Sequence, residues 1–180
     1  MGPTHSILLL IFTCVLVSLS WADIVNRTTD DSLGDSATHL LVTYLPTTDG
    51  VWETEKCTTC SIMPDISQTF SGTYTAATHM PGQSPISVTI DFTGIALWVF
   101  FTLANNISGA ATQTAVNFTL DGGPPTFYNH DPELSTTDFQ YKVLVFQNDS
   151  LDNIHHTLVI STSQFFPDPV YVNFDYAIYT

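Results

Sequence analysis

Paired histidines and paired cysteines are the residues of this sequence whose types could carry chemistry. His155 and His156 are consecutive, and imidazole nitrogens are common metal ligands. Consecutive side chains of a β-strand point to opposite faces, so these two cannot hold one ion together if they begin a strand. We expect one histidine to be packed and the other to be solvated, and we predict no metal site.

Cys57 and Cys60 are the cysteines that follow the N-terminal apolar run. We predict that they form a disulfide, because cysteines in an exported chain usually pair. The bond would hold the loop that carries Trp52. Redox activity is the alternative, but it requires a thiol pKa lowered at a helix N-terminus, and Pro64 indicates a loop. Zinc would need two more ligands, and no second cysteine pair follows.

Acidic side chains give no clear catalytic arrangement. Asp30–Asp35 is rich in oxygen ligands and could help to hold calcium, but it lacks the spacing of a calcium loop, so we expect a solvated acidic loop. Glycoside hydrolysis needs two carboxylates facing each other across a cleft. Asp91, Asp121, Asp131 and Asp175 are available, and the sequence places no two of them together. We therefore predict a protein that is not an enzyme and uses no cofactor.

Aromatic residues beside Asp, Asn or His are the candidate ligand site. A flat aromatic ring can stack on the apolar face of a sugar while neighbouring carboxylates and amides bond its hydroxyl groups. Phe127–Asp131 and Phe165–Asp168 look like loops of this composition, and Trp52 is a third aromatic residue in a loop. The alternative is that these rings cap the ends of the fold. The candidate ligand-binding residues are Trp52, Tyr128, Asn129, His130 and Asp131.

Composition excludes several classes of partner. The 180 residues include 3 Lys and Arg against 17 Asp and Glu, for a net charge of −14. Nucleic acids and anionic membranes attract basic surfaces, so neither is an expected partner. The length suits one domain, and the hydrophobic content suffices for a core.

The N-terminus predicts export. Ile7–Val17 is a short apolar run, and Ser20-Trp21-Ala22 offers the small residues that a signal peptidase requires. Residues 1–22 are therefore predicted to be a signal peptide cleaved between Ala22 and Asp23, although no Lys or Arg precedes the run. A membrane anchor is the alternative, but the run is too short to span a bilayer. We expect a secreted, extracellular domain over residues 23–180 with no membrane span.

Export makes the glycosylation sequons meaningful. Asn26, Asn106, Asn117 and Asn148 each begin an Asn-x-Ser/Thr motif. Asn117 lies in an alternating stretch in which it should face solvent. We predict glycans at all four, with unoccupied sequons as the alternative.

Apolar patterning predicts an all-β fold. Ile86–Phe92 alternates with period two, and Ile95–Phe101 is apolar throughout, as in a strand covered on both faces. We expect a hairpin centred on Gly94 that seeds the core. The sequence contains about eight predicted strands separated by turn signals. This pattern predicts an antiparallel β-sandwich, and the jelly roll is the arrangement we expect. The expected strands are 37–45, 69–78, 86–92, 95–101, 112–120, 139–146, 154–161 and 170–179.

Several motifs together resemble a known group of proteins. They are Trp52 with Cys57 and Cys60, Pro64-Asp65, Ser71–Tyr74, Asp91–Ala96, Asn117–Gly122, Phe139–Tyr141, Leu151, His156–Leu158 and Asn173–Thr180. They look like the uncharacterised secreted or membrane-anchored extracellular domains of mushroom-forming fungi (basidiomycetes), which resemble galactose-binding-like jelly rolls. Many members continue into a linker and a membrane span, so the resemblance implies an ectodomain without its anchor. The group has no established ligand, and no binding residues are carried over.

The leading hypothesis is a secreted, non-catalytic protein of the fungal cell surface or cell wall that binds carbohydrate. Its partners would be cell-wall glycans or another extracellular protein. The alternative is a structural or protein-interaction ectodomain without a small ligand. This alternative is motivated by Ala96, Trp98 and Phe100, which would form a second apolar face of the strand. Such a face has to be covered, and a partner chain could cover it. A glycan-active enzyme is the third hypothesis.

Overall fold

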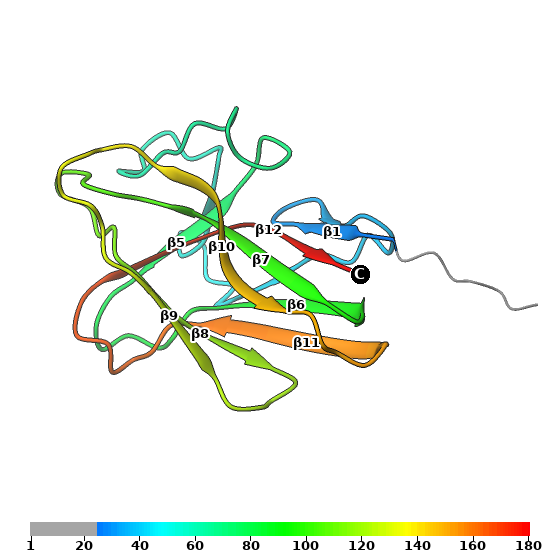
Figure 1. Ribbon diagram of the computed structural model, residues 1–180. Coiled ribbons are helices and arrows are strands. Elements are labelled where there is room, and N and C mark those ends of the chain that lie inside the picture. Colours follow the sequence, from blue (N-terminus) through cyan, green and yellow to red (C-terminus); the bar gives the residue numbers. More distant parts are fainter. Residues whose placement is uncertain (1–24) are drawn as a thin grey trace, which may run out of the picture.

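The structure is a computed structural model that describes residues 25–180, so the predicted signal peptide and its cleavage site lie outside it. The described residues form twelve β-strands in two antiparallel sheets and contain no helix (Figure 1). No helix able to cross a membrane is therefore found between residues 25 and 180. The strands are β1 Arg27–Asp30, β2 Gly34–Asp35, β3 Thr43–Leu45, β4 Glu53–Thr54, β5 Thr75–His79, β6 Ser87–Gly94, β7 Leu97–Leu103, β8 Thr114–Leu120, β9 Thr126–His130, β10 Gln140–Asn148, β11 Ile154–Ser161 and β12 Val170–Tyr179.

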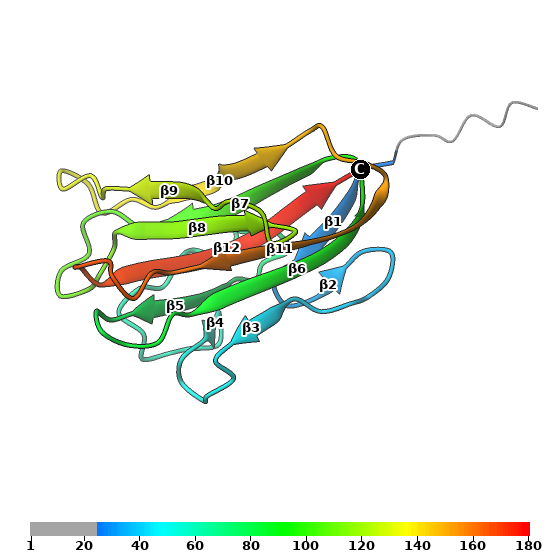
Figure 2. The same cartoon turned by 90° about the horizontal axis from the view of Figure 1, so that it is seen from below.

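The strand order confirms the predicted jelly roll. The larger sheet runs β10-β7-β12-β1-β2, with β5 also paired to β12 and β4 paired to β5; the smaller sheet runs β3-β6-β11-β8-β9. The last eight strands thus form two four-stranded sets, β5-β12-β7-β10 and β6-β11-β8-β9. This alternation between sheets is the double Greek key of a jelly roll. Figure 2 shows the strands of both sheets running along a common direction.

The number of strands exceeds the expected eight because short strands were missed. The strand expected over residues 37–45 is reduced to β3, and the one expected over 69–78 begins only at Thr75. β1 and β9 were expected to be loops. The polar strand β1 forms because β12 pairs with it, and β9 forms because β8 does. The sequence pattern within one segment does not show which distant strand will pair with it.

The expected hairpin at Gly94 is wrong. β6 pairs with β3 and β11 in the smaller sheet, whereas β7 pairs with β10 and β12 in the larger one. Gly94 therefore carries the chain from one sheet to the other, and the inward side chains of the two strands meet across the core. Gly94 is required for close approach, because a Cβ there would overlap the carbonyl oxygen of Thr180.

The core lies between the sheets. Phe101, Phe118 and Phe174 are among its largest fully buried side chains. The rings of Phe101 and Phe118 have centroids 6.1 Å apart, across the two sheets. Burial of these apolar side chains between the sheets is the main source of stability for a sandwich of this size.

The outer face of the larger sheet is covered in part as well. Residues 46–74, between β3 and β5, fold over it and are called the cap here. Phe70 of the cap stacks on Tyr176 at 4.3 Å, and Tyr176 stacks on Phe100 at 4.6 Å. Ala96 is buried, whereas Trp98 and Phe100 stay partly exposed. The cap therefore covers the apolar second face of β7 only in part, and the protein-interaction hypothesis keeps its motive.

Replacing Gly94 with alanine tests the crossing between the sheets. The added methyl group must displace the main chain at Thr180, and overpacking of this kind costs about 1–3 kcal/mol of unfolding free energy. Urea denaturation should show this loss for Gly94→Ala. The control is Thr93→Ala, at an exposed neighbouring position. Equal stability of the two variants would contradict the described crossing.

Candidate functional site

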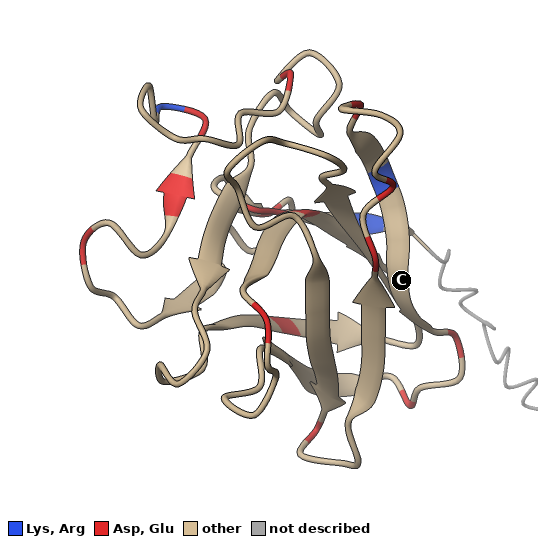
Figure 3. Ribbon diagram, turned by 90° about the vertical axis from the view of Figure 1, so that its left-hand side faces the viewer, with Lys and Arg blue, Asp and Glu red and all other residues tan. Residues whose placement is uncertain are grey.

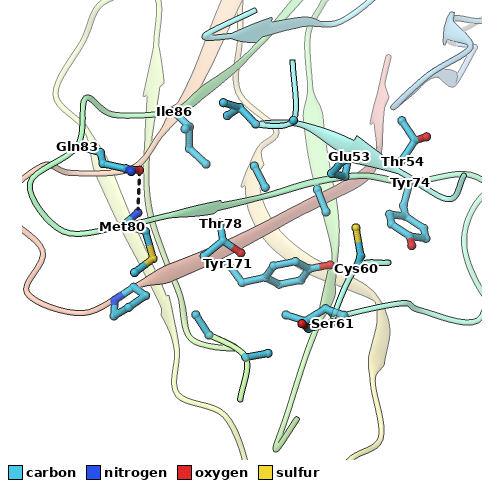
Figure 4. Close-up of a pocket in the computed structure, with 18 of the residues that line it drawn as sticks. Glu53, Thr54, Cys60, Ser61, Tyr74, Thr78, Met80, Gln83, Ile86 and Tyr171 are labelled. Carbon is cyan, nitrogen blue, oxygen red and sulfur yellow. Dashed lines mark hydrogen bonds between the residues drawn. The ribbon is translucent and has the colours of Figure 1, made fainter. Parts of the chain in front are cut away.

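The main pocket opens between the cap and the outer face of the larger sheet (Figure 4). Its volume is about 810 Å³, which is within the range typical of small-molecule sites. The walls come from the cap, from β5, from the β5–β6 and β7–β8 connections, and from Tyr171 of β12. These connections meet at one end of the sandwich, so the jelly roll itself positions the site.

Two tyrosines form the aromatic part of the pocket. Tyr171 is 4% exposed, and its hydroxyl accepts a hydrogen bond of 2.9 Å from Nδ2 of Asn173. Burial raises the pKa of Tyr171 well above its ordinary value, so the hydroxyl keeps its proton and can still donate. Figure 4 shows this hydroxyl directed toward Cys60 and Ser61. Burial also raises the pKa of Tyr74, with Glu55 adding to the effect.

Hydroxyl and amide groups line much of the remaining surface. Thr54, Ser61, Thr78 and Gln83 contribute polar atoms. Ile62, Ala76 and Ile86 supply apolar patches between them. A surface of this mixture can bond hydroxyl groups and also contact C–H faces.

Glu53 is the one carboxylate among the lining residues, and no Lys, Arg or His lines the pocket. It lies on β4, which pairs with β5 so that Glu53 is opposite Ala76. Within residues 25–180, the ion pairs that form are His155 with Asp91 and His156 with Asp121, so Glu53 is not in one. A pocket with a single carboxylate lacks the pair that glycoside hydrolysis requires.

The disulfide predicted from the sequence is formed. Cys57 and Cys60 have Cα atoms 5.8 Å apart, and Cys60 lines the pocket. Both sulfur atoms lie within 4.8 Å of an oxygen of Glu53. This group is no metal site while the sulfurs are bonded to each other, because metals bind the thiolate form.

The predicted ligand residues do not come together. Trp52 packs on Tyr44 with ring centroids 4.9 Å apart, and its indole N–H donates to the carbonyl oxygen of Leu45 at 3.2 Å. It is therefore a packing residue of the cap, close to the pocket in sequence but not in its lining. Trp52 thus packs against a neighbouring ring, as the alternative to ligand binding expected.

The segment expected to be a ligand loop is strand β9, and its side chains alternate between faces. Tyr128 packs against the core, and Nε2 of His130 lies 3.2 Å from the carbonyl oxygen of Ala104. Asn129 is on the exposed side and donates to Asp131 at 3.0 Å. Gln113 donates to both of these residues. The four residues thus face two directions and form no common site.

Tyr128 also lines a second, shallower cavity of about 650 Å³. This cavity lies beside the β8–β9 hairpin and β10, with Leu144 and Phe146 in its wall. Its lining also holds the polar residues Thr126, Gln147 and Asn148, but it has no charged side chain.

The sequons lie at accessible positions outside the main pocket. Asn26 and Asn106 are exposed, and Asn117 and Asn148 are partly exposed. Asn117 has the outward orientation that the alternation of β8 predicts. Glycosylation of the four residues stays a prediction.

The histidine pair divides as predicted. The side chain of His155 is 67% exposed and that of His156 is 4% exposed. Nδ1 of His156 is 2.7 Å from a carboxylate oxygen of Asp121, and Nε2 is 2.8 Å from the carbonyl oxygen of Asp152. Burial alone would lower the pKa of His156, but these two acceptors favour the imidazolium and raise it.

The prediction of a solvated acidic loop at Asp30–Asp35 is wrong. Asp30, Asp31 and Asp35 are buried, as is Asp175. The segment is drawn in because β1 pairs with the C-terminal half of β12 while β5 pairs with its N-terminal half. The end of β1 and the start of β5 therefore meet beside Asp175. We call Asp30, Asp31 and Asp175 the acidic junction.

The acidic junction is only partly neutralised by hydrogen bonds. Asp31 accepts from the hydroxyl groups of Thr73 at 2.7 Å and Thr75 at 2.6 Å. One oxygen each of Asp30 and Asp175 has no partner. Burial raises the pKa of Asp31 to about 7 and that of Asp175 to about 6.

Tyr171 and Glu53 were missed by sequence reasoning because they belong to no motif. The polar residues Asn173 and Asp175 alternate with apolar ones, which predicts a half-buried strand with one side in solvent. The local pattern therefore gave no signal of the cap or of the pocket.

Comparisons with known proteins give remote structural likenesses. No family model and no curated protein matches the sequence. An exo-β-1,3-galactanase from Phanerochaete chrysosporium, solved with galactose, aligns with 88% of this chain and 30% of its own at 13% identity and TM-score 0.44. The Agl-KA catalytic domain aligns over 93% and 30% at 11% identity and TM-score 0.45. CBM35 from Cellvibrio japonicus Abf62 aligns over 77% and 93% at 10% identity and TM-score 0.41.

The chain spans less than a third of the length of the galactanase and of the Agl-KA domain. All three TM-scores are below 0.5, so these likenesses carry no argument about function.

The buried acids predict a stability maximum in mildly acidic solution. Asp31 and Asp175 bind protons more tightly in the folded state, so the free energy of unfolding falls as pH rises from about 4 to about 7. The raised pKa of His156 acts in the same direction, because its bonds stabilise fully below pH 6.5 and are lost as pH rises through its folded pKa. Burial of Asp35 is outweighed by hydrogen bonds from Tyr179 and Thr38, which lower its pKa, so its contribution is lost only below pH 3.8.

Thermal denaturation between pH 3 and pH 8 measures this profile. Melting should occur at a higher temperature at pH 5 than at pH 8, and Asp31→Asn should remove much of the difference. Asp149→Asn, at an exposed position, should leave the profile unchanged. A melting temperature that stays level or rises from pH 5 to pH 8 would contradict the account of the acidic junction.

Proposed function

We propose that this chain is a secreted, non-catalytic carbohydrate-binding domain of the fungal cell surface or cell wall, and that its ligand occupies the main pocket. The observation that carries the proposal is the lining of that pocket. Tyrosine rings and small apolar side chains alternate with hydroxyl, amide and carboxylate groups. Sugars present the same mixture, with C–H faces between hydroxyl groups.

The rigidity of the pocket supports binding. Its lining includes three residues of the paired strand β5, Tyr171 of the central strand β12, and Cys60, which is fixed by its disulfide to Cys57. The cap is also fastened at its far side, where the backbone N–H of Asp65 donates to the hydroxyl of Tyr141 at 2.8 Å. A preformed site loses little conformational entropy when a ligand binds.

The lack of a second carboxylate in the lining supports a binding role over hydrolysis. Asp91 and Asp121 lie instead with the two histidines, and Asp131 bonds Asn129 and Gln113. Among the described residues, Glu53 therefore has no carboxylate opposite it in the pocket. The export signal and the resemblance to fungal extracellular domains support the proposed location.

Blocking the pocket tests the proposal. Oligosaccharides of β-glucan, chitin, chitosan, mannan and galactan are screened on an array, and the best of them is measured by calorimetry. Ser61→Trp fills the pocket and should weaken binding at least tenfold. Thr58→Trp, in the adjacent disulfide loop but outside the lining, should bind as the unmodified protein does. Equal affinities for both variants, or no binding to any oligosaccharide, would overturn the proposal.

A further inference from the structure

The charge of the pocket narrows the class of sugar, provided that the proposed carbohydrate function holds. The sequence has 3 Lys and Arg in all, and neither these nor any histidine lines the pocket. Figure 3 shows acidic residues spread over the loops and basic ones at few places. An anionic ligand would find no cation in the pocket and would meet the carboxylate of Glu53.

We propose that the pocket selects sugars that carry a free amino group, as in de-N-acetylated chitin, and that Glu53 binds their ammonium group. Glu53 is suited to this because it is partly buried on a paired strand and makes no ion pair. A charge-assisted hydrogen bond between a carboxylate and an ammonium group is roughly twice as strong as a neutral one. The cost of removing water from Glu53 is then offset by its own ligand.

The surroundings of Glu53 strengthen the preference for a cation. Asp49 and Glu55 lie close to it in sequence, with Lys56 as the nearby basic residue. Glu55 contributes to the raised pKa of Tyr74, a residue of the pocket wall. One oxygen of Glu55 is buried without a hydrogen-bond partner. The local field around the pocket is therefore negative.

The net charge of −14 acts over a longer range. A polymer with many ammonium groups is attracted toward such a protein, which speeds its association and makes the rate depend on salt. This general attraction has to be separated from selection at Glu53.

Neutral and acidic sugars should bind more weakly for different reasons. An N-acetylated sugar keeps its hydroxyl groups but has no charge to pair with Glu53. A uronic acid places a second carboxylate beside Glu53 with no cation between them, which is unfavourable in a partly buried site.

Calorimetry at pH 5.5 with three tetrasaccharides tests the selection. The probes are tetramers of glucosamine, of N-acetylglucosamine and of galacturonic acid. We expect the glucosamine tetramer to bind at least tenfold more tightly than the N-acetylated one, and the galacturonic tetramer not to bind. Glu53→Gln should lower affinity for the glucosamine tetramer at least tenfold while changing affinity for the N-acetylated tetramer less than threefold.

Asp149→Asn is the control for charge, since it removes one negative charge from the exposed β10–β11 connection. This connection lies at the other end of the sandwich, where the N–H of Leu151 bonds the carbonyl oxygen of Ile95. Affinity should be unchanged in this variant. Suppose that Glu53→Gln and Asp149→Asn lose affinity for the glucosamine tetramer equally, and that 0.5 M salt (a screening length of about 4 Å) abolishes both losses. Binding would then reflect general polycation attraction, and the inference would be overturned.

The other outcomes separate the inference from the proposed function. Equal or tighter binding of the N-acetylated tetramer, unaffected by Glu53→Gln but lost in Ser61→Trp, would overturn amino-sugar selection and leave carbohydrate binding intact. Binding of none of the three tetramers, nor of any array glycan, would overturn both.

Discussion

Strand β12 must pair along both edges and bury both faces, and the rest of the structure follows from this constraint. One edge pairs with β7, and the other is shared by β5 and β1. Nine of its ten residues are buried and one is partly exposed, so both faces are largely closed to water. A strand covered in this way needs a second layer outside the sandwich, and the cap provides it. The main pocket is the part of this outer face that the cap leaves open.

Covering the outer face also buries polar groups that a simple sandwich would leave in water. Tyr171 and Asn173 bond each other there, and Asp175 bonds the backbone N–H of Phe70. The carboxylates of the acidic junction are less completely satisfied, which is why their pKa values rise. Unpaired buried oxygen atoms are costly, so the same contacts that fasten the cap make the stability depend on pH.

The sequence predicted the sheet core well because the alternation of apolar residues is a local signal. The long strands β6, β7, β8, β10, β11 and β12 were all expected close to their observed bounds. The hairpin at Gly94 failed because alternation does not tell which sheet a strand joins. β1 was missed because its polar residues Arg27–Asp30 form a strand only by pairing with β12. The buried position of Asp31 follows from the same pairing, so it could not be predicted either.

The candidate site was predicted less well for a related reason. Aromatic residues near Asp or Asn in sequence were taken to be near one another in space. On strand β9, however, Tyr128 and Asn129 point to opposite sides, and Trp52 is used for packing on Tyr44. The pocket instead collects Glu53, Ser61 and Tyr171 from segments far apart in the chain. Only the disulfide, a local feature, was correctly expected near this site.

Amide hydrogen exchange in the native state tests the central position of β12 most directly. A strand that is paired on both edges and covered on both faces should open only when the whole domain unfolds. The account predicts that the hydrogen-bonded amides of β12 exchange as slowly as the slowest amides of β7, whereas those of the edge strand β10 exchange faster. If the amides of β12 exchanged as fast as those of β10, the outer face would not be covered, and the pocket beneath the cap would not exist as described.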